Sequence, residues 1–123
     1  MNALFGSSIN EGAGLNILRF PIGSCDFSLT MTSYDEVSDD YTLSQFQIDN
    51  DSEYIIEVIQ DAIKINPEMT LIASPWSAPS WLKVMNSLLG LKERNTLVDD
   101  DNVYDTYATY LLETIKAFQQ RGL

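Results

Sequence analysis

Three side chains in this 123-residue sequence form a set that could recognise a sugar or another ligand rich in hydroxyl groups. Arg19 lies inside a short apolar segment, where a charged guanidinium is costly unless it is paired or bound. Asp26 follows the end of that segment, and its carboxylate could accept hydrogen bonds from two neighbouring hydroxyls. Trp76 follows a second apolar segment, where an indole could stack on a sugar ring and donate its N–H.

Each of these residues also has a structural interpretation. Arg19 could form an ion pair with a nearby acid, and Asp26 could cap the N–H groups of a local turn. Trp76 could pack at the rim of a core. For Trp81, five residues further on, we favour such packing over ligand binding.

The residue inventory excludes several other chemistries within this chain. Without histidine, the chain cannot hold a Ser-His-Asp triad, a Cys-His dyad or a His-ligated zinc ion. The single Cys25 excludes an internal disulfide and a multi-cysteine metal site, and its acidic neighbour argues against a reactive thiol. Residues 39–40 and 99–101 are runs of aspartate, which we expect to be solvated loops and helix caps because consecutive carboxylates cannot all face one ion. We therefore predict no metal and no cofactor.

The charge balance narrows the range of partners. Seven Lys and Arg residues stand against 18 Asp and Glu residues, for a net charge of −11. Nucleic-acid binding and polybasic membrane binding both need basic side chains, so neither is expected. The sequence has no apolar run long enough to cross a membrane, and residues 1–6 lack the features of a signal peptide. The 45% hydrophobic content supports a packed core.

Two strands and two helices are expected to position these side chains. Segments 15–22 and 69–74 are nearly continuous apolar runs, typical of parallel strands buried on both faces. A helix is predicted to begin near residues 49–52 and to end before Pro67, with an apolar stripe formed by Ile55, Val58, Ile59 and Ala62. Another is predicted after residues 99–101, with a stripe formed by Tyr104, Tyr107, Ala108, Leu111, Ile115 and Phe118.

The order of the elements predicts an α/β fold. Residues 2–13 are predicted to form the end of a helix and a glycine-rich turn. A strand, a helix, a second strand and a second helix are predicted after them. This alternation predicts parallel pairing with right-handed crossovers. Long connections, 23–51 and 82–101, follow the strands, as they do at the functional end of a (β/α)8 barrel. Two strands cannot close a barrel, so the expected fold is a partial one.

Two motifs carry a family resemblance. Segment 16–28 (NILRFPIGSCDFS) and segment 73–83 (ASPWSAPSWLK) resemble the second- and third-strand segments of glycoside hydrolase family 30, the acid β-glucosidase or glucosylceramidase family. Segments 33–35 and 39–41 match the intervening loop in order and spacing, and the resemblance runs from about residue 3 to the end of the chain. It implies a (β/α)8 barrel with an attached β-sandwich, and a retaining β-glycosidase.

The resemblance also assigns roles to the three candidate residues. Arg19, Asp26 and Trp76 match residues that bind the glucose hydroxyls in the −1 subsite of the family. The two catalytic carboxylates of the family lie on its fourth and seventh strands, and the Asn-Glu-Pro motif of the fourth strand is absent here. A retaining glycosidase needs both, about 5–5.5 Å apart. We therefore expect no catalytic residue in this chain and no activity from it alone.

The resemblance further implies that residues 1–123 are an internal fragment, strands two and three with their helices, of a larger catalytic domain. Residues 84–87 depart from the family, which usually has a glycine after the asparagine there. The expected substrate is glucosylceramide or another β-glucoside, and the parent enzyme is expected to be lysosomal or secreted, with a lipid-presenting activator protein as a further partner. The alternatives are a β-1,6-glucanase or β-xylosidase of the same family, and a non-catalytic glycan-binding or regulatory module.

Overall fold

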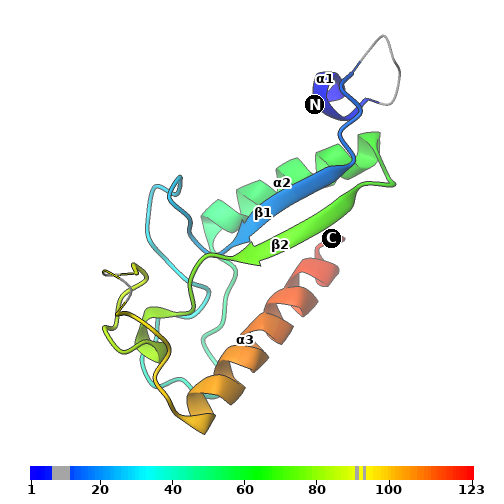
Figure 1. The fold of residues 1–123 in the computed structure, drawn as a ribbon. Coiled ribbons are helices and arrows are strands. Elements are labelled where there is room, and N and C mark those ends of the chain that lie inside the picture. The colour runs from blue at the N-terminus through cyan, green and yellow to red at the C-terminus, as the bar shows by residue number, and fades with distance from the viewer. Residues whose placement is uncertain (7–11, 91, 93) are drawn as a thin grey trace.

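The computed structural model describes residues 1–6, 12–90, 92 and 94–123. Within them it has the helix α1 (Asn2–Phe5), the strand β1 (Ile17–Ile22), the helix α2 (Asn50–Ile65) and the strand β2 (Thr70–Pro75). A short 3-10 helix η1 (Ser80–Leu82) and the long helix α3 (Asp101–Gln120) follow. The expected turn after the first helix falls partly on residues 7–11, outside the described residues. Figure 1 shows the parallel strands side by side, with α2 behind them.

β1 and β2 pair in parallel, as the order of elements predicted. Ile17 lies opposite Thr70 and Ile22 opposite Pro75, so the strands start and finish together. The Asn66 side chain, at the end of α2, donates to the Leu15 carbonyl at 3.0 Å and holds the entrances of the two strands close. α2 is thus the crossover of a βαβ unit.

Both long helices begin at aspartate caps. The Asp49 carboxylate accepts from the Ser52 N–H at 2.7 Å, and the Asp100 carboxylate accepts from the Asn102 N–H at 2.8 Å. These bonds satisfy N–H groups that the first turn of a helix leaves without partners. α2 ends immediately before Asn66, next to Pro67, as predicted.

The buried stripes of the helices differ in part from the predicted ones. On α2, Ile59 and Ala62 are buried as expected. Val58, which was predicted to lie on the buried stripe, is exposed, and Ile56 is buried instead. On α3, Tyr104 and Ile115 are exposed; the buried side chains are Val103, Thr106, Tyr110, Thr114, Ala117 and Phe118. Of the predicted stripe, Phe118 is buried against Phe20 of the sheet, and Tyr107 and Leu111 are partly buried against the same core. The Tyr104 hydroxyl instead donates to the Asp99 carboxylate at 2.9 Å.

An aromatic cluster joins the sheet, α3 and the connection after β1. The Phe20 and Phe118 rings lie 5.5 Å apart, and Tyr34 stacks on Tyr110 with 6.1 Å between ring centroids. The Tyr34 N–H donates to the Tyr110 hydroxyl at 3.1 Å, and the Tyr34 hydroxyl donates to Ser52 at 2.9 Å. Burial raises the pKa of Tyr110, which is neutral at physiological pH. This cluster fixes the path of the long connection.

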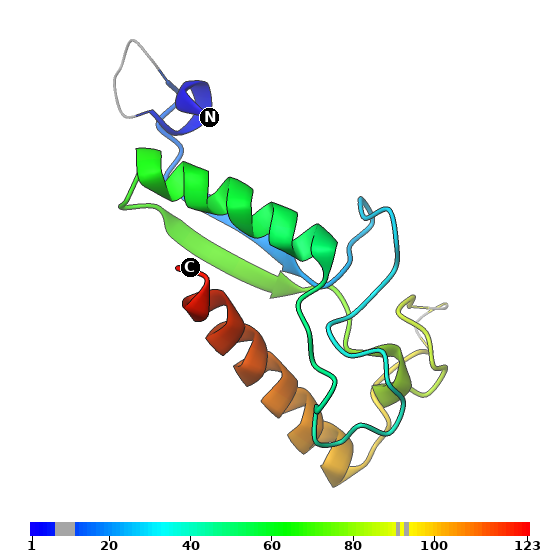
Figure 2. The same cartoon turned by 180° about the vertical axis from the view of Figure 1, so that it is seen from behind.

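Among the described residues, one face of the sheet is covered and the other is open, so the expectation of burial on both faces is wrong for these two strands by themselves. Phe20 and Ile22 point toward α2 and α3 and are buried, at 6% exposure each. On the opposite face Ile17 is 58% exposed and Ile72 is 46% exposed. Figure 2 shows α2 lying over the covered face. No helix within the described residues is long and apolar enough to cross a membrane.

Candidate functional site at the carboxyl ends of the strands

Both strands finish at the same end of the molecule, and a long connection leaves each of them there (Figure 1). Residues 23–49 follow β1, and residues 76–100 follow β2. Gly23 makes the turn out of β1 with φ +71°, a backbone conformation that side chains other than glycine rarely adopt. The Ser24 hydroxyl then donates to the Thr30 carbonyl at 2.9 Å and accepts from the Thr32 N–H at 2.7 Å. These contacts fold residues 24–32 back beside the strand end.

Arg19 lies on the open face of the sheet, opposite Ile72 in the register. Its guanidinium donates to the Ser74 hydroxyl at 3.0 Å and lies 5.1 Å from the centroid of the Trp76 ring. That is within the range of a cation–π interaction. None of the ion pairs found among the described residues includes Arg19, so the ion-pair interpretation finds no support there. The arginine instead holds the indole from one side.

Asp26 and Trp76 line one cavity. Its volume is about 300 Å³, and its lining comprises Ser24, Asp26, Met31, Trp76, Ser77, Leu88, Leu89 and Gly90. Trp76 is 46% exposed, which leaves much of the indole open to a ligand. Asp26 is exposed, and its carboxylate accepts no hydrogen bond from the described residues. The local turn is closed by Ser28, whose hydroxyl accepts from the Cys25 N–H at 3.0 Å. The structure therefore brings Arg19, Asp26 and Trp76 together.

Trp81 packs at the rim, as expected. Its indole N–H donates to the Asp35 carbonyl at 3.1 Å, and its ring lies edge-on to Tyr41 with 5.5 Å between centroids. Asp35 is buried beside it, and one carboxylate oxygen accepts from the Val37 N–H at 3.0 Å. Burial, together with the charges of Asp40 and Glu36, raises the pKa of Asp35. These contacts anchor the connection after β1 to η1.

The acidic pair 39–40 behaves as a loop element. The carboxylate of Asp40 accepts from Thr42, Ser44 and the Gln45 N–H. Desolvation raises its pKa, but these hydrogen bonds outweigh that effect and hold the value at about 2. Within the described part of the chain, no group of His, Cys, Asp and Glu side chains could hold a metal ion.

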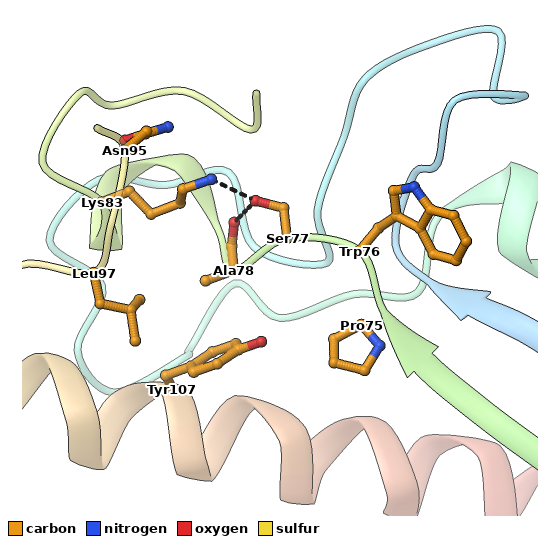
Figure 3. A pocket seen from close by; sticks show the side chains of 8 residues that line it. All are labelled: Pro75, Trp76, Ser77, Ala78, Lys83, Asn95, Leu97 and Tyr107. Atoms are coloured by element: carbon orange, nitrogen blue, oxygen red, sulfur yellow. Dashed lines mark hydrogen bonds between the residues drawn. The ribbon is translucent and has the colours of Figure 1, made fainter. Parts of the chain in front are cut away.

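The structure adds functional candidates that sequence reasoning missed. A second cavity of about 250 Å³ lies between the end of β2 and α3. Figure 3 shows Lys83 reaching across it to Ser77, which comes directly after Trp76. The Lys83 ammonium donates to the Ser77 hydroxyl at 2.8 Å and to the Leu88 carbonyl at 3.2 Å, and burial lowers the pKa of Lys83. The only sequence signal was a lysine in an otherwise uncharged motif, residues 73–83.

Asn95 is the other missed residue. It is buried, at 8% exposure, and its side chain donates to the Ser87 and Leu89 carbonyls and accepts from the Met85 N–H. One asparagine within a polar connection carries no signal in a single sequence. Asn86, in the segment that departs from the family, takes φ +44°, which asparagine tolerates better than most residues.

A crossover unit with long connections at the carboxyl ends of its parallel strands is a building block of a (β/α)8 barrel. The sequence pattern described as "Glycosyl hydrolase family 30 TIM-barrel domain" matches residues 2–123. The chain belongs to glycosyl hydrolase family 30, and its fold is part of that barrel.

The relatives of this chain are named for two activities, glucosylceramidase and endo-1,6-β-D-glucanase. The chain is 39% identical over 115 residues to "Putative glucosylceramidase 3" of Caenorhabditis elegans, covering 92% of this chain and 22% of the relative. It is 33% identical over 115 residues to the lysosomal acid glucosylceramidase of Mus musculus, with the same coverage of 92% and 22%. To the endo-1,6-β-D-glucanase of Neurospora crassa it is 29% identical, covering 90% of this chain and 23% of the relative. The chain thus spans about a fifth of the length of these relatives.

Solved structures show the same architecture. SrfJ from Salmonella typhimurium superposes with a TM-score of 0.85 at 28% identity, covering 99% of this chain and 26% of SrfJ. The endo-β1,6-glucanase BT3312 gives a TM-score of 0.77 at 28% identity, with the same coverage of 99% and 26%. These matches confirm the expected partial barrel.

Proposed function

We propose that this chain is an internal fragment of the catalytic domain of a retaining β-glucosidase. Arg19, Asp26 and Trp76 would form part of its −1 subsite, the position of the glucose unit. The observation that carries the proposal is the shared cavity: Asp26 and Trp76 line it together, and Arg19 holds Trp76 from the strand side.

Each residue has a distinct task in this proposal. The exposed Asp26 carboxylate accepts hydrogen bonds from two adjacent sugar hydroxyls. The Trp76 indole offers its face to the apolar side of the ring. Arg19 and Ser74 keep the indole in place before the ligand arrives, so little ordering remains to be done on binding. The acid/base and nucleophilic carboxylates would come from other strands of the complete barrel.

The proposed substrate is glucosylceramide. Support comes from relatives with 33–39% identity that carry the name glucosylceramidase. A lipid-presenting activator protein, and a lysosomal or secreted location, belong to the same proposal. The second candidate is a β-1,6-glucanase, favoured by the glucanase relatives at 29% and 27% identity and by the structural match to BT3312.

The test uses the complete enzyme that contains this segment, assayed on an aryl β-glucoside. Replacing Asp26 or Arg19 by alanine is expected to lower kcat/KM by an amount equal to about 2–4 kcal/mol of transition-state stabilisation. Asp26→Ala leaves the hydroxyls of the bound sugar without their acceptor, and Arg19→Ala removes the contacts with Ser74 and Trp76 that hold the indole in place. Trp76→Ala is expected to remove about 1–3 kcal/mol through lost stacking. The control is Asp61→Ala, which removes an exposed acid on α2 and should leave kcat/KM unchanged. Near-normal kinetics for all three site variants, with circular dichroism unchanged, would contradict the proposed subsite.

The isolated 123-residue chain supplies a second test. It is expected to show no turnover of an aryl β-glucoside at any pH, because both catalytic carboxylates lie outside it. Turnover that survives the Asp26→Ala substitution would show that the chemistry is elsewhere in this chain.

A further inference from the structure

Lys83 carries an ammonium group that is bonded to uncharged partners. It donates to the Ser77 hydroxyl at 2.8 Å and to the Leu88 carbonyl at 3.2 Å. None of the ion pairs found in the described part of the chain includes it, although the sequence holds 18 Asp and Glu residues. Lys83 is partly buried, so its ammonium gives up hydration without the attraction that an ion pair returns. The position of this ammonium is therefore set by the two groups that it joins.

The backbone of Lys83 is fixed as well. Its N–H donates to the Ser80 carbonyl at 3.0 Å at the end of η1, and the residue pairs with Leu97 in an isolated antiparallel bridge. The Leu88 carbonyl anchors the far end of the side chain. A lysine loses much rotamer freedom when it is ordered, and here that ordering precedes the arrival of any ligand.

Ser77 links this ammonium to Trp76. Its hydroxyl accepts from Lys83 and donates to the Ala78 carbonyl at 2.8 Å, so both of its hydrogen-bonding roles are used. Figure 3 shows Lys83 reaching Ser77 from the side away from the Trp76 indole. Because Ser77 is the next residue after Trp76, the bond to Lys83 restrains the backbone from which the indole extends.

The direction of the indole matters because Trp76 lines two cavities. One is shared with Asp26, and the other contains Lys83. Trp76 is 46% exposed, so packing alone holds it weakly. The Arg19 guanidinium, 5.1 Å from the ring centroid, holds the ring from the strand side, and the bond between Lys83 and Ser77 holds the backbone from the side of η1.

We propose that Lys83 is a positioning residue, which directs the Trp76 indole toward the glucose unit through its bond to Ser77. This inference rests on the proposed function, in which Trp76 stacks on that sugar. Lys83 lines the neighbouring cavity and not the one that Asp26 and Trp76 share, so it acts through the residues that it holds. An ammonium has three donors, enough for the Ser77 hydroxyl and the Leu88 carbonyl at once.

The test is a double-variant cycle in the complete enzyme, read from kcat/KM on an aryl β-glucoside. Lys83→Met keeps a side chain of similar length without its donors, so kcat/KM is expected to fall about tenfold. In the Trp76→Ala background the same substitution should cost less than about twofold, because no indole remains to be directed. Lys83→Arg keeps the charge and several donors and should stay within about threefold of the unaltered enzyme. The control is Lys64→Met, which removes an exposed lysine on α2 and should leave kcat/KM unchanged.

Two results would overturn the inference. One is a Lys83→Met loss that is absent, or that has the same factor in both backgrounds, as a merely structural role predicts. The other is a loss in Lys83→Arg as large as in Lys83→Met. If Lys83→Met does not fold, Ser77→Ala breaks the same bond, and its loss should likewise disappear in the Trp76→Ala background.

Trp76→Ala separates the two levels of the account. If it lowers kcat/KM while the Lys83→Met loss is equal in both backgrounds, only the positioning role fails. If Trp76→Ala by itself leaves kcat/KM unchanged, the proposed function of Trp76 fails.

Discussion

The two faces of the sheet differ in what covers them. On the face toward α2 and α3, Phe20 and Ile22 are buried in a cluster with aromatic rings from two other segments. On the other face Ile17 and Ile72 are about half exposed, and Arg19 extends along the sheet to Ser74 and Trp76. The covered face holds the segment together. Arg19 on the open face, and Asp26 and Trp76 beyond the carboxyl ends of the strands, are the residues proposed to bind the sugar.

This difference shows why apolar strands alone do not reveal how a sheet is covered. Alternate residues along β1 point to opposite faces, and the isoleucines on the open face are as apolar as the buried ones on the other. In a closed barrel the open face would line the interior, and neighbouring strands would pair with both edges. The apolar residues on the open face are therefore suited to a barrel that continues beyond these two strands.

The largest expected effect concerns the open face of the isolated chain. The described residues leave both outer edges of the sheet without a pairing strand. The purified chain should therefore self-associate or bind ANS, a dye for exposed apolar surface, with strong far-UV and weak near-UV circular dichroism. Size-exclusion chromatography with thermal unfolding followed in both spectral regions checks this. A sharp monomeric peak with coincident cooperative transitions would contradict it and would favour a self-sufficient module.

Substitutions on the two faces sharpen the same comparison. Replacing Ile17 and Ile72 by threonine should lower ANS binding by the isolated chain while retaining its helical signal, because those side chains contact solvent.

In the complete enzyme, Phe20→Ala on the covered face is expected to cost about 3–5 kcal/mol of unfolding free energy through lost burial and a cavity. Urea unfolding measures that loss. A cost under about 1 kcal/mol would show that the aromatic cluster does not hold the segment together.

The buried carboxyl group of Asp35, in the connection after β1, allows a test by pH. Asp26 is exposed at the open edge, whereas burial raises the pKa of Asp35 above its ordinary 3.8. The folded protein thus favours protonated Asp35, and its ionisation lowers stability as the pH rises past the unfolded value. Asp35→Asn should therefore stabilise the complete enzyme progressively as the pH rises above the unfolded pKa, until Asp35 is ionised in the folded protein as well, and should have no such effect below the unfolded pKa. Unfolding midpoints that shift equally at every pH would argue against a buried, titrating Asp35.

The smallest effect is expected for the ion pair on the covered side. The single Nε–H of Arg121 is shared between the two oxygens of the Glu53 carboxylate, at 2.9 and 3.0 Å, and Nη2 also donates to Glu53. These hydrogen bonds lower the pKa of Glu53. Both side chains are partly exposed, so Glu53→Gln should cost about 0.5 kcal/mol of unfolding free energy at neutral pH. The difference should fade as the pH drops through the pKa of Glu53, and also in high salt. A salt-independent cost above about 2 kcal/mol would assign the pair a larger role.

The backbone plan and the site were predictable to different degrees. Strand order, parallel pairing and the starts of both helices followed from apolar runs, caps and prolines, because those signals are local. The buried stripe of α3 was predictable only in part: Phe118 is buried as predicted, whereas only tertiary contact selects Tyr110 rather than Tyr104 for burial. The proximity of Asp26 and Trp76 followed from parallel topology. Lys83 and Asn95 could not be found, because their partners are mostly backbone carbonyls of a loop whose path no local pattern specifies.

The most direct test of the central claim is a crystal structure of the complete enzyme with a glucose-configured inhibitor bound. The account predicts the Asp26 carboxylate within hydrogen-bond distance, about 2.5–3.0 Å, of two ring hydroxyls, with the Trp76 indole against the ring and Arg19 still beside that indole. A sugar ring bound away from the carboxyl ends of β1 and β2, with Asp26 and Trp76 facing only solvent, would contradict it.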